Sequence, residues 1–226
     1  MKITYLGHSS FIIETKGTQL LFDPFISGNP LAKNIDISTI PADYILLSHG
    51  HQDHVLDAEA IAKRTGAKII SNFEIVSWYG EKGIEGHPMN HGGKFKFDFG
   101  IVKYVNAIHS SVLPDGTYGG NPGGFVIWND EGCFYFAGDT ALTMDMKLIP
   151  MTCPQLDFAV LPIGDNFTMS YDEAIIACDF INCEKVVACH YDTFGYIKID
   201  HKEVQKAFSD KGKELVLLSI GESLNI

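Results

Sequence analysis

Residues 48–54, Ser-His-Gly-His-Gln-Asp-His, place four strong metal-binding side chains within six positions. The apolar residues 44–47 come directly before them and predict a buried strand that ends where the cluster begins. His49 and His51 are two positions apart, so in an extended segment both imidazoles point to the same side. We therefore expect these two side chains to reach one metal ion.

The second half of this stretch turns away from the strand. Gly50 lacks a side chain where the turn must be tight, and a helix is predicted at residues 55–65. Asp53 and His54 are expected to face a second ion beside the first. Without a cation, three histidines and an aspartate would crowd unpaired nitrogens into one loop, whereas metal sites favour imidazole and carboxylate at short spacing. We interpret the stretch as a metal-binding loop.

Composition and charge narrow the class of protein. A length of 226 residues fits one domain, residues 1–226, with a large core. The formal net charge is -11 and Arg64 is the only arginine. Proteins that bind nucleic acid usually present a basic face, and arginine is the usual bidentate clamp for phosphate. A nucleic-acid partner is therefore not expected, and bound divalent cations would offset part of the acidity.

The cysteines and the N-terminal residues bear on the compartment. The 5 cysteines lie in apolar or helical contexts without zinc-ribbon spacing, which favours reduced core thiols in a cytosolic protein. Residues 1–7 are typical of a strand rather than a signal peptide. No apolar run approaches the length of a membrane span. We expect a cytoplasmic protein without stable membrane association.

Periodicity and turn residues predict an alternation of strands and helices. The strand–helix order of residues 43–78 predicts parallel pairing in that half of a sheet. Three segments are expected outside regular structure: a long loop at 26–41 over the site, a turn at 87–93, and a flexible glycine-rich loop at 118–124 on the substrate side. Strands are predicted at residues 2–6, 9–15, 18–22, 43–47, 68–71, 94–99, 101–107, 125–128, 132–137, 157–162, 185–189 and 214–219. Further helices are predicted at residues 73–78, 171–182 and about 200–210.

Three further strands end in a candidate ligand. His109 follows the strand at 101–107, Asp139 follows the strand at 132–137, and His190 follows the strand at 185–189. Together with residues 48–54 this pattern resembles the signature of the metallo-β-lactamase-fold hydrolases. The strings at residues 7–11, 164–169 and 190–194 (Gly-His-Ser-Ser-Phe, Gly-Asp-Asn-Phe-Thr-Met and His-Tyr-Asp-Thr-Phe) resemble an uncharacterised branch close to the ascorbate-6-phosphate lactonase-like proteins.

The resemblance covers essentially the whole chain and implies a fold and a ligand set. The implied fold is α+β, an αββα four-layer sandwich with two mixed sheets flanked by helices. Two divalent ions are implied, with Asp139 as the bridging ligand; class B β-lactamases have cysteine at this place. Zinc is the first choice, and manganese or iron fits nearly as well. The implied metal ligands are His49, His51 and His109 for one ion, Asp53, His54 and His190 for the other, and Asp139 for both.

Other residues carry open alternatives. Asp53 is implied to take part in proton transfer as well as in metal binding. The resemblance places His8 near the mouth of the site, where it either functions or makes a structural hydrogen bond. Asp165 either borders the pocket or forms a cap or turn before the next helix, and Thr193 is a candidate substrate contact. Asp23 either supports the metal loop or forms a turn.

The implied activity is that of a two-metal hydrolase. A hydroxide between the ions would attack an ester or lactone carbonyl, or a phosphodiester, of a small molecule. The shortage of arginine disfavours phosphate substrates, although Lys33 and Lys198 could serve. The alternative from another class is a metal-stabilised binding or sensor protein without turnover. Oligomeric state stays open, and a homo-oligomer is compatible with the sequence.

Overall fold

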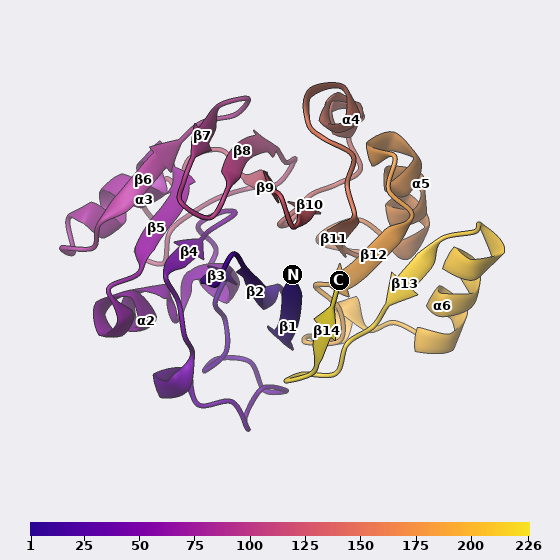
Figure 1. Ribbon diagram of the computed structural model, residues 1–226. Coiled ribbons are helices and arrows are strands. Elements are labelled where there is room, and N and C mark those ends of the chain that lie inside the picture. The colour runs from indigo at the N-terminus through magenta and orange to yellow at the C-terminus, as the bar shows by residue number, and fades with distance from the viewer.

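The computed structural model describes residues 1–226 and contains two seven-stranded sheets packed face to face, with helices on their outer sides (Figure 1). The first sheet has the order β14-β1-β2-β3-β4-β5-β6, and its antiparallel meander gives way to parallel pairing from β3 onward. Its strands are β1 (Lys2–Gly7), β2 (Ser10–Thr15), β3 (Thr18–Phe22), β4 (Tyr44–Leu46), β5 (Lys68–Asn72), β6 (Gly86–Met89) and β14 (Ser223–Asn225).

The second sheet repeats this plan in the order β13-β12-β11-β10-β9-β8-β7, antiparallel up to β10 and parallel beyond it. The α+β sandwich of two mixed sheets is thereby confirmed, as is parallel pairing around β4 and β5. The last strand, β14, pairs with β1 and brings the chain ends together, so that the Met1 amino group donates to the Ile226 carbonyl at 3.0 Å. The strands are β7 (Lys94–Lys96), β8 (Ile101–Asn106), β9 (Gly123–Asn129), β10 (Gly132–Phe136), β11 (Phe158–Pro162), β12 (Lys185–Cys189) and β13 (Glu214–Val216).

The hydrophobic core forms three layers because successive strand side chains point to opposite faces. In β4, Leu46 packs between the sheets while Ile45 faces the helices outside. The central layer is rich in phenylalanine, and the rings of Phe22 and Phe136, from opposite sheets, lie 4.7 Å apart. Burial of one such ring contributes about 1.5–3 kcal/mol. The outer layers lie under α2 (Ala58–Thr65) and α3 (Phe73–Gly80) on the first sheet and under α5 (Tyr171–Ile181) and α6 (His201–Asp210) on the second.

The prediction of a single helix at residues 55–65 is wrong. The chain forms α1 (Gln52–Val55), breaks, and continues as α2. At the break, the buried Asp57 carboxylate accepts hydrogen bonds from the backbone N–H groups of Ile26 and Ser27, at 2.6 and 2.9 Å. This tertiary contact bends the chain, and it leaves Asp53 and His54 inside α1 instead of in a loop before the helix.

Three other expectations need correction. Residues 87–89 of the expected turn belong to edge strand β6 (Gly86–Met89), which completes the parallel half of the sheet. The expected strand at 94–99 pairs only over Lys94–Lys96, and those side chains are exposed rather than half-buried. The loop at 26–41 contains the short 3-10 helix η1 (Ile37–Thr39) and packs apolar side chains against the outer layer of the first sheet. None of its residues lines the largest cavity.

Four further elements were not expected from sequence: the last strand β14, the 3-10 helices η2 (Met144–Leu148) and η3 (Gly195–Ile197), and α4 (Ile149–Thr152). All five cysteines carry free thiols, and all but the half-buried Cys153 are buried, as expected for core thiols. No helix of this fold combines the length and the hydrophobicity that a membrane crossing requires.

Candidate metal centre

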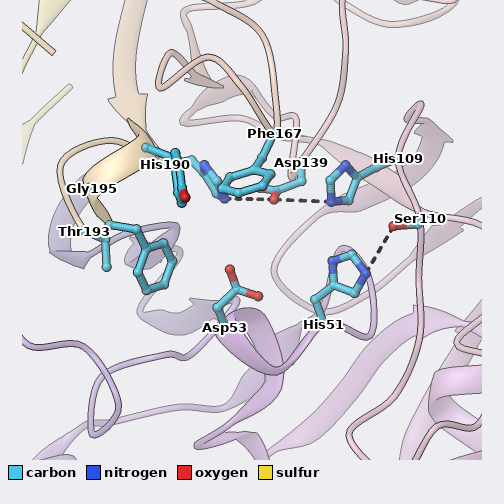
Figure 2. Close-up of a pocket in the computed structure, with 11 residues that line it drawn as sticks. His51, Asp53, His109, Ser110, Asp139, Phe167, His190, Thr193 and Gly195 are labelled. Carbon is cyan, nitrogen blue, oxygen red and sulfur yellow. Dashed lines mark hydrogen bonds and ion pairs between the residues drawn. The ribbon is translucent and has the colours of Figure 1, made fainter. Parts of the chain in front are cut away.

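The side chains expected to bind metal converge at one end of the sandwich, where five of them line a cavity of about 790 Å³ (Figure 2) and the fully buried His49 and His54 lie beneath it. Each sheet supplies part of the floor: β4 leads into the loop and helix at residues 48–55, and β8, β10 and β12 lead to the later ligand candidates. We call His49, His51 and His109 the histidine group, and Asp53, His54 and His190 the mixed group. In each group the potential donor atoms lie within 4.8 Å of one another, and His8 lies within the same distance of the mixed group.

The histidine group presents inward-facing nitrogens that are neutral. His49 Nε2 and His51 Nδ1 face each other at 3.0 Å. Their other nitrogens are anchored outside the group: His49 Nδ1 donates to Ser48 Oγ at 2.9 Å, and His51 Nε2 lies 3.3 Å from Ser110 Oγ. Burial lowers the pKa of all three imidazoles, that of His49 well below its usual value. Neutral imidazoles with fixed outer nitrogens are the form that binds a metal ion.

The mixed group is anchored by a buried carboxylate. Asp23 is fully buried and accepts a hydrogen bond from His54 Nδ1 at 2.8 Å. It also accepts from the backbone N–H and the hydroxyl of Ser48, at 2.8 and 2.5 Å, and that hydroxyl in turn holds His49. Asp23, His49 and His54 also lie close enough to form a third donor group, but the oxygens of Asp23 are already occupied. Asp23 therefore supports the loop that carries the candidate ligands.

Asp139 lies between the two groups. Its Oδ2 is 3.0 Å from His190 Nε2, 3.3 Å from His54 Nε2 and 3.7 Å from His109 Nε2, as the dashed lines to His190 and His109 in Figure 2 indicate. The preceding Gly138 has φ +63°, and a Cβ there would lie 2.5 Å from Ser48 Cβ, so only glycine allows this approach. One carboxylate thus faces donors of both groups.

The buried carboxylates beneath the cavity need a positive charge to balance them. Burial alone would lower the pKa of His54, but Asp139 and Asp23 outweigh it and raise that pKa well above its usual value. Burial alone would raise the pKa of Asp139, but His190 and His54 hold it well below the usual range. Without a metal ion, a proton on His54 balances the buried carboxylates. A divalent cation supplies the same positive charge.

Unsatisfied polar atoms provide an independent test of the fit. His54 Nε2, Asp139 Oδ1 and His190 Nδ1 are buried without a hydrogen-bond partner in the protein. Such burial is unfavourable unless another group satisfies the atoms. Both histidines also place their Nε2 atoms beside Asp139 Oδ2, so the unsatisfied atoms belong to one cluster of side chains. Imidazole nitrogens and carboxylate oxygens suit zinc, manganese and iron, so the residues present fit bound divalent metal ions.

His8 lies behind Asp53 and does not line the cavity. Its Nε2 is 3.2 Å from Asp53 Oδ2, and its Nδ1 is 3.0 Å from the hydroxyl of Thr193. Burial lowers the pKa of His8 to about 4, so the ring is neutral, its Nε2–H donates to Asp53, and Thr193 donates to Nδ1. Burial would raise the pKa of Asp53, but His8 and His54 hold it well below the usual range. His8 thus orients an ionised Asp53, and Thr193 lines the cavity.

Asp165 lies outside the cavity. Its carboxylate accepts a hydrogen bond from the backbone N–H of Asn166 at 2.7 Å, and Ser170 caps α5 in its place. Neither His87 nor His91 joins a donor group; His91 Nε2 donates to the Pro122 carbonyl at 2.8 Å.

The glycine-rich loop at residues 118–124, expected on the substrate side, does not line the cavity either. Its Gly119 carbonyl accepts a hydrogen bond from Asn72 Nδ2 at 2.7 Å. Five residues that line the cavity were not expected from sequence: Ser110, Phe167, Phe194, Gly195 and Tyr196. The one signal for them was their position, within a few residues of candidate ligands or strand ends.

Comparisons with known proteins agree with this geometry. Residues 2–190 match the family model described as a β-lactamase superfamily domain. A UPF0173 metal-dependent hydrolase from Flavobacterium johnsoniae is 63% identical over 226 residues and covers all of both chains. A protein of the same description from Bacillus subtilis is 42% identical, again over all of both chains. A solved metallo hydrolase from the archaeon Ignicoccus hospitalis is 35% identical and superposes with a TM-score of 0.89, covering 99% of this chain and 97% of the other.

Proposed function

The chain belongs to the β-lactamase superfamily and, within it, to the UPF0173 metal-dependent hydrolases, and we propose that it binds two divalent ions and hydrolyses an ester or lactone of a small molecule. A phosphodiester is the competing substrate class. The position of Asp139 Oδ2, within 3.0–3.7 Å of imidazoles from both donor groups, is the observation that carries the proposal. A carboxylate shared by two metal sites is a common feature of two-metal hydrolysis.

In this proposal the histidine group would hold one ion and the mixed group the other, with Asp139 available to both. Zinc is the first choice of metal, with manganese and iron as alternatives. When bound, such ions lower the pKa of water and polarise the bond to be cleaved. The histidines supply neutral lone pairs, and Asp53 and Asp139 supply the negative charge that offsets the ions.

Asp53 is the residue proposed to move a proton. Its side chain is 30% exposed on the cavity floor, and its Oδ2 is held by His8. The low pKa keeps this carboxyl ionised but makes it a weak base, so at Oδ1 it would accept a proton only from water whose own pKa a bound metal ion lowers. Thr193 fixes the His8 ring and thereby the direction of the carboxylate.

The cavity size supports a small-molecule substrate. Pockets for small ligands usually enclose about 300–1,000 Å³, and this cavity, at 790 Å³, lies within that range. The net charge of -11 gives no attraction to nucleic acid.

Metal analysis of the purified protein, followed by a hydrolysis screen with each reloaded metal, tests the proposal. We expect about two equivalents of metal per chain. Activity on lactones, esters or phosphodiesters should disappear on chelation and return on reloading. Two equivalents with no hydrolysis across these panels would favour a binding or sensor protein. Less than one equivalent under every metal would reject the two-ion site.

A further inference from the structure

The cavity above the candidate metal centre combines a polar floor with an aromatic wall. Phe167, Phe194 and Tyr196 line it together with the histidines and carboxylates of the floor, and Figure 2 labels Phe167 among them. Phe167 and Tyr196 are 50% and 79% exposed, so these rings present apolar surface to solvent beside the site. Apolar walls with a few convergent polar groups are the usual construction of a small-molecule site.

The two exposed rings come from different loops and meet at the cavity. Phe167 follows β11, and Tyr196 lies in η3, which follows β12. Their ring centroids are 6.2 Å apart with an interplanar angle of 81°, an edge-to-face arrangement. Together they offer an apolar surface that continues from the polar floor.

The loop that carries Phe167 is shaped by unusual backbone conformations. Asp165 and Asn166 have φ values of 60° and 54°, in the left-handed region that non-glycine residues seldom adopt. The Asp165 carboxylate accepts from Asn166 N–H, and Asp165 N–H donates to the Met169 carbonyl at 3.1 Å. Two consecutive left-handed residues cost free energy that these bonds offset in part. Their effect is to direct Phe167 into the cavity, which gives Asp165 a role in shaping the loop.

The third ring, Phe194, packs against a residue that lies behind the cavity floor. Phe194 packs edge-on against His8, with centroids 5.3 Å apart, and lies 6.3 Å from Phe25. His8 is the residue that orients Asp53. The aromatic wall is therefore continuous with the residues that position the proposed proton acceptor.

No lysine or arginine lines the cavity. Arg64, the only arginine, donates to the carbonyls of Ile37 and Ile40 in the loop that packs outside the first sheet. Apart from the proposed metal ions, an anionic substrate would find no lysine or arginine of the cavity to pair with its charge, whereas phosphate sites usually offer one beside the metal.

We propose that the substrate is an uncharged ester or lactone with an apolar ring or alkyl chain that packs on Phe167 and Tyr196. This inference rests on the proposed function, because it places the scissile bond at the histidine and carboxylate floor. It selects among the substrate classes left open above and disfavours phosphodiesters.

Three γ-lactones that share one scissile ring test the inference: unsubstituted γ-butyrolactone, its 5-pentyl derivative and its 5-carboxylate derivative. With the metal-loaded enzyme, we expect kcat/KM to be about tenfold higher for the pentyl lactone than for the unsubstituted one. The carboxylate lactone should be the poorest substrate. Equal rates for the pentyl and unsubstituted lactones, or a preference for the carboxylate, would overturn the inference.

Variants of the two exposed rings test whether the preference for the pentyl lactone arises from them. Phe167→Ala and Tyr196→Ala should each lower kcat/KM for the pentyl lactone roughly fivefold, mainly through KM, and lower it by a smaller factor for the unsubstituted lactone. Met151→Ala is the matched control, because Met151 is 76% exposed on α4 and does not line the cavity. An equal loss in the control, or no loss in either aromatic variant, would contradict the inference.

A non-hydrolysable probe separates this inference from the proposed function. Binding of 2-pentyltetrahydrofuran, which lacks the carbonyl, can be measured by saturation-transfer NMR on the same proteins. Binding that weakens in Phe167→Ala while no lactone is hydrolysed would retain the apolar subsite and reject the activity. Lactone hydrolysis without binding of the probe, and without a pentyl preference, would retain the activity and reject the subsite.

Discussion

The histidine group and the mixed group lie side by side on one floor but are stabilised by different chemistry. Serine hydroxyls anchor the first, with Ser48 behind His49 and Ser110 beside His51. A buried carboxylate, Asp23, anchors His54 in the second. Exposure does not separate the groups, because each combines a fully buried histidine, His49 or His54, with a more exposed side chain, His109 at 15% or Asp53 at 30%.

The two groups therefore offer a cation different kinds of stabilisation: neutral imidazole ligands in the histidine group, and carboxylate charge in the mixed group. Burial lowers the pKa values of His49, His51 and His109, so the histidine group offers lone pairs with little charge. In the mixed group, the neighbouring carboxylates outweigh burial and raise the pKa of His54. A cation in the mixed group therefore gains from the charges of Asp53 and Asp23 in addition to that of Asp139, which both groups share. We expect the mixed group to bind its ion more tightly.

Asp139→Asn should have the largest effect, because it removes the negative charge that both groups share. We expect both ions to be lost or greatly weakened, and hydrolysis to fall by at least about 100-fold, since changes in outer-shell partners alone cost 10–100-fold. Metal content by atomic spectroscopy and kcat/KM on one substrate check this. A variant that kept both equivalents and full activity would show that Asp139 does not link the groups.

Asp23→Asn should have the next largest effect and should separate the groups. It removes the charge behind His54, so we expect the affinity for the mixed-group ion to fall about 10–100-fold. The histidine group should lose less, because Asp23 reaches His49 only through Ser48 Oγ. Competition with a chromophoric chelator, resolved into two steps, measures both affinities.

Asp57→Asn is the matched control for that variant. Asp57 is also buried and also accepts backbone hydrogen bonds, but it contacts residues Ile26 and Ser27 rather than a candidate ligand. We expect a loss of about 1–3 kcal/mol in the free energy of unfolding, with both metal affinities preserved. If the control lost metal as readily as Asp23→Asn, general loosening of the fold would explain both results.

The candidate ligands could be predicted from sequence because their signal is local. Each follows an apolar run that becomes a buried strand, and a strand end fixes where the next side chain begins. His109, Asp139 and His190 illustrate this, since β8, β10 and β12 end within three residues of them. Strands that pack in two facing sheets then bring these distant positions to one end of the sandwich.

The residues that shape the cavity could not be predicted in the same way, because their positions depend on tertiary contacts. Phe167 reaches the cavity because Asp165 and Asn166 adopt left-handed conformations, which the sequence does not display as a glycine would. The break between α1 and α2 depends on Asp57 meeting a loop some 30 residues away. Apolar periodicity carries no information on either feature. The sequence therefore suggested Asp165 at the border of the pocket, whereas Phe167 lines the cavity.

Ser110→Ala should have the smallest effect. Ser110 is exposed, its hydroxyl lies 3.3 Å from His51 Nε2, and water can replace it once it is removed. A neutral hydrogen bond contributes about 0.5–1.5 kcal/mol, and replacement by water recovers part of that, so we expect less than about threefold loss in affinity for the histidine-group ion. The mixed-group ion should not change. The same two-step chelator competition measures it, and a loss as large as that of Asp23→Asn would mean that ring orientation, rather than buried charge, determines how firmly each group holds its ion.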